Sequence, residues 1–293
     1  MSPGFRYHVV SIAAVFFALT VGLVVGSLLV SPRVADQQKS MLHNIQNTVN
    51  KELTDGKKRD ANYKAALAQI APELLRDRLK GESIALIQVG EYPETADRVK
   101  EALQQAGANV SSVTNIEKLL DKTDDELKKA LLDSGFTDTT DRESVMKLLV
   151  SALLKGEADG ESLSRLETAH LITRQVNGDY VNSVSRIILI AGSRAEGSTR
   201  VKNVDLPLAQ ALLTLNKRVV MVEPVDAATS DVPQYRQLNI EATTIDNADT
   251  DIGGIALVLA LTGDRDDYGV KPATASRLMP PISPRVATGA RVP

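Results

Sequence analysis

The sequence predicts an N-terminal transmembrane helix, a long helical linker with coiled-coil character, and a three-layer α/β domain with a mostly parallel sheet and a helical insertion. Three observations support this fold class. Residues 9–30 form a run of 22 uncharged residues. Residues 34–71 contain no proline and one glycine. From residue 81 onward, short apolar runs alternate with helical periodicity, which is the pattern of buried strands covered by helices.

The apolar run is long enough to cross a membrane, and a short N-terminal tail, residues 1–8, precedes it. At ~1.5 Å per residue it spans the ~30 Å hydrocarbon core of a bilayer. A signal-peptide core is normally about 7–15 residues long and precedes a small-x-small cleavage site. Here Arg33 stands where a small residue is needed. The sequence therefore predicts an uncleaved anchor.

Flanking charge leaves the orientation of this anchor undecided. The α-amine and Arg6 precede it and Arg33 and Lys39 follow it, and long domains translocate largely regardless of such charges. The absence of cysteine fits an oxidising exterior. An anchor this close to the N-terminus is typical of an exported domain. We therefore expect a single-pass protein of the cell membrane with the bulk of its chain extracytoplasmic.

Small residues recur at a spacing of four within the anchor. This small-xxx-small pattern lets two helix backbones approach closely in lipid, and it predicts self-association of the anchor. The alternative is that glycine and alanine are simply common in membrane helices. The residues are Ala14, Ala18, Gly22 and Gly26.

The linker, residues 31–80, carries an incomplete heptad pattern. Four apolar residues share one heptad position, but the companion series, 45, 52, 59 and 66, is half polar, whereas a good two-stranded coil needs both positions apolar. We predict a weak or interrupted coiled coil that supports a homo-oligomer. The alternative is a single solvated helix that packs against its own domain. The seam residues are Leu42, Val49, Tyr63 and Ile70.

The α/β domain is predicted to cover residues 81–271. Its strands read as short apolar runs of the kind that parallel sheets bury, and the segments between them have helical periodicity. A helical insertion occupies about residues 115–178. Residues 272–293 contain five prolines and few large apolar groups, which predicts a disordered tail. The expected strands are 83–89, 109–113, 186–191, 218–223 and 243–245, and the expected helices are 94–106, 205–216 and 254–262.

One loop at the carboxyl end of a predicted strand resembles an anion-binding site. It combines glycine, hydroxyl and guanidinium groups in Gly192, Ser193, Arg194 and Ser198. It is neither a P-loop nor a G-x-G-x-x-G fingerprint. A Gly-Ser pair after a strand is also ordinary turn chemistry, so the loop is a weak candidate.

Other chemistry is poorly supported by the sequence. The net charge of −3 and the pI near 5.7 give no electrostatic footprint for nucleic acid. There is no cysteine, and the three histidines, His8, His43 and His170, lie in separate segments. No nucleophile elbow and no pair of carboxylates with shared acid–base spacing is present. We therefore expect a non-catalytic protein with no cofactor and no metal site.

Motifs at the two ends of the chain resemble the bacterial family named after the mycobacterial copper transport protein MctB. At the N-terminus these are Tyr7 to Phe16 with Gly22 and Gly26-Ser27. At the C-terminus they are Asp246 to Gly253, Ala256 to Leu261, Tyr268-Gly269 and Leu278 to Pro280. The similarity runs from about residue 5 to residue 281.

The resemblance implies copper handling at the cell envelope and, for a corynebacterial relative, control of a cell-wall hydrolase through the coil. Two hypotheses follow. The chain is a membrane-anchored, oligomeric, non-catalytic component that binds an envelope protein, or it is a copper transport component that moves or gates copper across the envelope. An α/β enzyme that uses the Gly192 loop is a weaker third.

Overall fold

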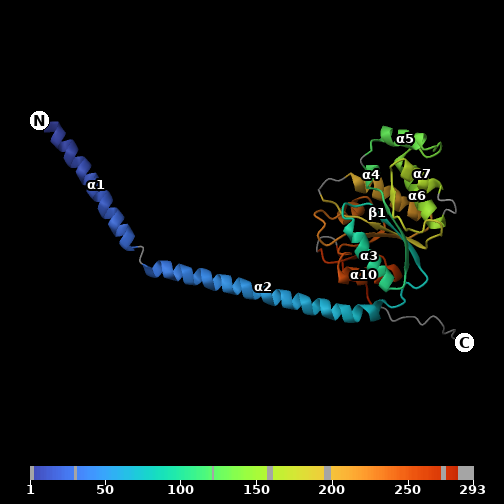
Figure 1. The fold of residues 1–293 in the computed structure, drawn as a ribbon, viewed down its shortest axis with the longest axis horizontal. Coiled ribbons are helices and arrows are strands. Elements are labelled where there is room, and N and C mark those ends of the chain that lie inside the picture. Colours follow the sequence, from blue (N-terminus) through green and yellow to red (C-terminus); the bar gives the residue numbers. More distant parts are fainter. Residues whose placement is uncertain are drawn as a thin grey trace. The chain divides into compact units, whose positions relative to one another are not determined.

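The computed structural model describes residues 3–29, 32–120, 122–156, 161–194, 199–271 and 275–282 (Figure 1). The chain divides into two compact units, residues 1–65 and residues 66–293.

The first unit contains α1 (Pro3–Leu29) and most of α2 (Pro32–Leu75). Within α1, the segment Tyr7–Gly26 is long and apolar enough to cross a membrane, with a mean hydropathy of 2.6. No other described helix meets that criterion. Large apolar side chains such as Phe17, which is 73% exposed, cover it. Since so large an apolar surface is unfavourable in water, this helix needs a covering that the described residues of the chain do not supply.

The predicted heptad seam of α2 is exposed in the single chain. Leu42, Val49, Tyr63 and Ile70 are between 47% and 61% exposed. The helix continues through Pro72 and ends three residues later at Leu75. The structure thus confirms a long helix, while the coiled coil remains a prediction.

One seven-stranded sheet forms the centre of the second unit, in the order β3-β2-β1-β4-β5-β6-β7. Every neighbouring pair is parallel except β2 with β3. The predicted three-layer, mostly parallel α/β domain is therefore confirmed. The strands are β1 (Ser83–Gln88), β2 (Asn109–Asn115), β3 (Thr173–Arg174), β4 (Arg186–Ile190), β5 (Val219–Val222), β6 (Ala242–Ile245) and β7 (Asp267–Tyr268).

Alternate residues of each central strand enter two different cores, one on each face of the sheet. Ile84 and Leu86 of β1 join the core beneath α3 (Glu94–Gln105) and α10 (Asp251–Thr262), two helices that lie together in Figure 1. Ala85 and Ile87 join the core beneath α6 (Arg142–Lys155) and α8 (Leu206–Thr214).

The predicted helical insertion supplies much of the second core. It contains α4 (Glu117–Leu120), α5 (Asp124–Asp133), α6 and α7 (Glu161–Thr168). Capping boxes start two of these helices, Thr123 with Glu126 at α5 and Asp141 with Ser144 at α6. Buried leucines on α5, α6 and α7 belong to the same core as the sheet. The insertion is therefore part of the helical layer.

Four short elements were not predicted. β3 and β7 have two residues each, which is too short to show alternation. The helix α9 (Val232–Gln237) and the π-helical turn η1 (Val201–Asp205), which precedes α8, have no clear apolar period. Part of the predicted tail, residues 275–282, is described: Arg277 accepts a hydrogen bond from the Gly269 N–H (2.9 Å). Residues 272–274 and 283–293 lie outside the described residues.

Candidate functional site

The carboxyl edge of the sheet is where an α/β fold of this topology binds ligands. The strands that run parallel have the order β2-β1-β4-β5-β6-β7, and the direction of winding reverses between β1 and β4. The first five of them follow the flavodoxin-like arrangement. The loops that follow β1 and β4 therefore flank the position where a ligand crevice is expected.

The two loops contact each other through their backbones. The Gly90 N–H donates to the Ile190 carbonyl at 2.8 Å, and the Glu91 N–H donates to the Gly192 carbonyl at 3.1 Å. A Cβ atom on Gly90 would lie 2.3 Å from the carbonyl carbon of Ala191. Glycine is thus needed at position 90 because the two loops are in direct backbone contact beside the expected crevice.

The candidate anion loop already holds a carboxylate of its own chain. Gly192, whose φ is +103°, donates its N–H to Asp231 Oδ2 at 2.8 Å. The Ser193 hydroxyl donates to Asp231 Oδ1 at 2.8 Å. Asp231 is fully buried. The donors that predicted an anion site therefore bind an internal anion.

The other two candidates do not add to this group. Arg194 donates its N–H to the Glu91 carboxylate and its Nε to the Glu91 carbonyl at 3.2 Å. Its guanidinium lies over the Tyr92 ring, 5.2 Å from the centroid. It thus fastens the two loops together. Ser198 lies outside the described residues.

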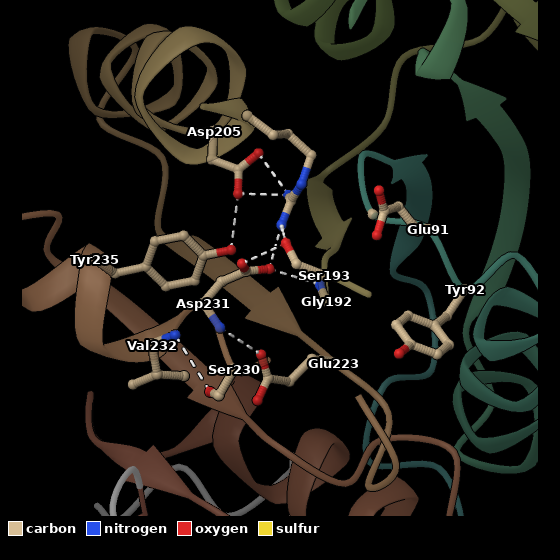
Figure 2. A network of polar contacts seen from close by, with 12 residues as sticks. Glu91, Tyr92, Gly192, Ser193, Asp205, Glu223, Ser230, Asp231, Val232 and Tyr235 are labelled. Carbon is tan, nitrogen blue, oxygen red and sulfur yellow. Dashed lines mark hydrogen bonds and ion pairs between the residues drawn. The ribbon is translucent and has the colours of Figure 1, made fainter. Parts of the chain in front are cut away.

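Arg200 is the central cation of the buried network in which Asp231 takes part. Its Nη1 donates to both oxygens of Asp205 at 2.9 and 2.7 Å, and its Nη2 donates to Ser193 Oγ at 3.2 Å and to Asp231. The Tyr235 hydroxyl donates to Asp205 Oδ2 at 2.8 Å. Figure 2 shows Ser193, Asp205, Asp231 and Tyr235 pointing toward one another.

Burial dominates the electrostatics of this network. It raises the pKa of Asp205, against the opposing effect of Arg200. Burial, followed by the charges of Asp205 and Asp231, raises the pKa of Tyr235 well above its ordinary value, so the phenol stays a neutral donor. Burial alone would lower the pKa of Arg200, but Asp205, Tyr235 and Asp231 raise it above its ordinary value.

A second ion pair continues the network toward the C-terminal part of the domain. Glu223, directly after β5, accepts from the Asp231 N–H at 3.0 Å and from Lys271 Nζ at 2.9 Å. Burial raises the pKa of Glu223, while Lys271 opposes that rise. The network therefore ties the ends of β4 and β5 to α9 and to the segment after β7.

Sequence reasoning missed Arg200, Asp205, Asp231 and Tyr235 as one site. They are spread over 36 positions of the chain and meet only because parallel strands end at a common edge. The sequence contains one signal for this site: Asp205 and Asp231 are charged residues that each directly precede apolar residues of a helix, which indicates that their carboxylates are buried.

Metal ligands do not gather in the part of the chain that the structure describes. Within it, no group of three or more histidine, cysteine, aspartate or glutamate side chains is placed to hold a metal ion. His8 lies on α1, His43 lies on α2, and His170 follows α7 with a φ of +55°.

The fold and this edge define a class of protein: an α/β domain of flavodoxin-like strand order that follows, along the chain, an apolar helix of membrane-spanning length. A family model described as "Copper transport outer membrane protein, MctB" matches residues 4–280. The chain therefore belongs to the MctB family. It is similar to the proteins named "Copper transporter MctB" of Mycobacterium tuberculosis and Mycobacterium bovis, with 22% identity over 289 residues that cover 87% of this chain and 91% of theirs.

Proposed function

We propose that this protein is a single-pass, membrane-anchored component of the cell envelope that serves copper handling by binding a protein partner and catalyses no reaction. The exposed apolar helix Tyr7–Gly26 carries the membrane part of the proposal. Family membership supports a role connected with copper.

The engagement of Gly192 and Ser193 by Asp231 at the carboxyl edge supports a non-catalytic role. In this fold class, catalytic and ligand-binding groups normally line the crevice at the switch point. Here the loops after β1 and β4 are in backbone contact, and Asp231 takes the donors of Gly192 and Ser193. The polar groups at this edge thus stabilise the domain itself. What the domain offers to other molecules is its surface.

The two exposed stripes support an oligomer. Adding a Cβ atom at Gly22 or Gly26 would meet no described atom within 4 Å, so nothing within the described chain explains small residues there. The seam of α2 is about half exposed as well. A second copy would cover both.

The proposed topology places residues 31–293 outside the cytoplasm. Protease added to intact spheroplasts should remove the α/β domain, and detergent should not be needed for cleavage. A cytoplasmic protein should stay intact in the same sample. Full protection of the domain until detergent is added would contradict the topology.

A deletion strain tests the function. Loss of the gene should change copper tolerance, and the full chain should restore it, whereas a chain with residues 9–30 replaced by a cleavable export signal should restore it poorly. A chain with Asp231→Asn, compared at an equal level of folded protein, should complement fully, because the edge is structural. If a folded Asp231→Asn variant failed to complement while the wild-type chain succeeded, the carboxyl edge would have a chemical role.

The second candidate is direct copper transport, which the names of the family and its mycobacterial relatives favour. The full chain in detergent is titrated with Cu(I) against a chromogenic chelator. We expect no stoichiometric transfer, because no three histidine, cysteine, aspartate or glutamate side chains of the described residues are placed to hold a metal ion. One Cu(I) bound per chain at micromolar affinity or better would favour the transport role.

A further inference from the structure

A cavity of about 370 Å³ lies at the opposite edge of the sheet, where the parallel strands begin. Glu82 directly precedes β1, Arg186 starts β4, and Lys217 and Arg218 directly precede β5. These strands are neighbours in the order β1-β4-β5. The topology therefore brings side chains from three distant parts of the sequence to one pocket, here called the amino-edge pocket.

Glu82 is the one carboxylate among the residues that line this pocket, and it is already engaged. It accepts from the Ser185 hydroxyl at 2.5 Å and from Arg186 Nε at 3.2 Å. The hydrogen bond from Ser185 is the largest influence that lowers the pKa of Glu82, followed by the contacts with Arg186. Glu82 therefore stays ionised and balances one of the three cations.

The remaining two cations have no counter-charge in contact within the described residues. Arg218 donates to neutral oxygens with all three guanidinium nitrogens: Nε donates to Thr243 Oγ1 at 2.9 Å and Nη1 to the Gly263 carbonyl at 2.7 Å. Its Nη2 donates to Thr243 Oγ1 at 2.7 Å and to the Asp264 carbonyl at 2.5 Å. Lys217 makes no ion pair with any described residue. Burial, and then the positive charges of Arg265 and Arg186, lower the pKa of Arg218. Like charges are thus crowded around an open volume.

We propose that the amino-edge pocket binds a phosphate-bearing anion, held by Arg186, Lys217 and Arg218. Lys217 supplies a compact point charge whose ammonium makes no ion pair with a described residue, and the guanidinium groups of Arg186 and Arg218 add positive charge beside it. An anion would relieve the repulsion among the three cations. The volume falls within the range of ligand pockets, about 300–1,000 Å³. This proposal does not depend on the function proposed above.

Helix capping accounts for only part of the arrangement. Arg218 Nη1 donates to Gly263, directly after α10, as cations near helix C-termini commonly do. Together with the hydrogen bonds to Thr243 and to the Asp264 carbonyl, that contact explains the position of Arg218. It leaves unexplained why Arg186 and Lys217 line the same cavity and why the cavity is open.

The test uses the full chain in an uncharged detergent, titrated calorimetrically with pyrophosphate. Lys217→Gln removes a charge that makes no ion pair with a described residue, and it should weaken binding about tenfold. Lys128→Gln, an exposed lysine on α5, is the matched control and should bind as the wild type does. Thermal unfolding confirms that each variant is folded.

Two further probes identify the source of the phosphate. Glycerophosphoglycerol, the headgroup of phosphatidylglycerol without its tails, represents a lipid; inorganic phosphate represents a soluble ligand. Binding of either one, weakened by Lys217→Gln, supports the pocket, and the preferred probe names the source. The proposal is overturned if no probe binds at millimolar concentration. It is equally overturned if Lys217→Gln and Lys128→Gln bind alike.

Discussion

The Ser193 hydroxyl and the Asp231 carboxylate meet over 2.8 Å at the carboxyl edge of the sheet, where both residues are buried. Ser193 follows β4 and Asp231 precedes α9, so 38 positions of the chain separate them. Both residues also contact Arg200. The loop after β4 has the composition of a ligand site, but these hydrogen bonds make it part of the folded core.

Asp231→Asn should strongly destabilise the domain. The change leaves the buried Arg200 guanidinium with one carboxylate partner, and breaking a buried pair costs about 3–5 kcal/mol. Chemical denaturation of the full chain in detergent measures the loss. Asp226→Asn, at an exposed position in the same loop, is the control and should change the free energy of unfolding by less than about 0.5 kcal/mol. Equal stability of the two variants would show that the network contributes little.

Glu82 gives a pH dependence with a definite sign. Its pKa is lowered from 4.5 in the folded chain, chiefly by the Ser185 hydrogen bond. Its contribution to stability is therefore present above pH 4.5 and is lost as the pH falls through the lowered value. The difference in melting temperature between wild type and Glu82→Gln should be present at pH 7 and shrink below pH 4.5.

Ser185→Ala provides the second arm of that experiment. Removing the hydroxyl removes the largest cause of the lowered pKa, so the stability of this variant should begin to fall at a higher pH than that of the wild type. A loss that starts at the same pH in both proteins would assign the effect to another carboxylate.

The small-residue stripe of the anchor makes a prediction about association in lipid. Gly22→Ile with Gly26→Ile should weaken dimers about tenfold, since bulk at these positions prevents close approach of two backbones. Val21→Ile with Val25→Ile adds bulk on a neighbouring side of the helix and is the control. Förster transfer between labelled chains in vesicles measures the dimer. An unchanged signal in the glycine variant would show that the small residues do not mediate association and only reflect the usual composition of membrane helices.

The α2 seam can be tested by cross-linking, because the chain contains no cysteine. Val49→Cys places a thiol at the seam, where a parallel two-stranded coil would bring two copies within disulfide distance. Asn47→Cys places it on the outer side of the helix. Mild oxidation in native membranes should give a covalent dimer for Val49→Cys and little for Asn47→Cys. Equal cross-linking at both positions would indicate random collision.

Local pattern was sufficient for most of the fold. Short apolar segments such as Ile84–Ile87 and Ile255–Leu261 of α10 indicate burial by themselves. The five longer parallel strands and the main helices that cover them are therefore predictable from the sequence. β3 and β7 were missed because two residues carry no period, and they form only where a neighbouring strand offers free backbone groups.

The sites were harder to predict than the fold. The Gly192 loop has the right groups for an anion, but nothing local shows that Asp231, 39 positions later, takes them. Arg186 and Arg218 likewise look like ordinary residues before a strand until the strand order makes them neighbours. Sequence spacing identifies which groups are present, whereas the topology decides which of them face each other.

The pairing of β1 with β4 sets a condition on how this domain is made. Ile84 lies beside Arg186, so 102 residues of chain must be synthesised after Ile84 before the two central strands can join. At a synthesis rate of about 5–20 residues per second, the apolar segment Ile84–Ile87 waits roughly 5–20 s without its partner. Parallel pairings of such long range also close slowly. We therefore expect mutations that slow the central pairing to reduce the yield of protein even where they leave its final stability intact.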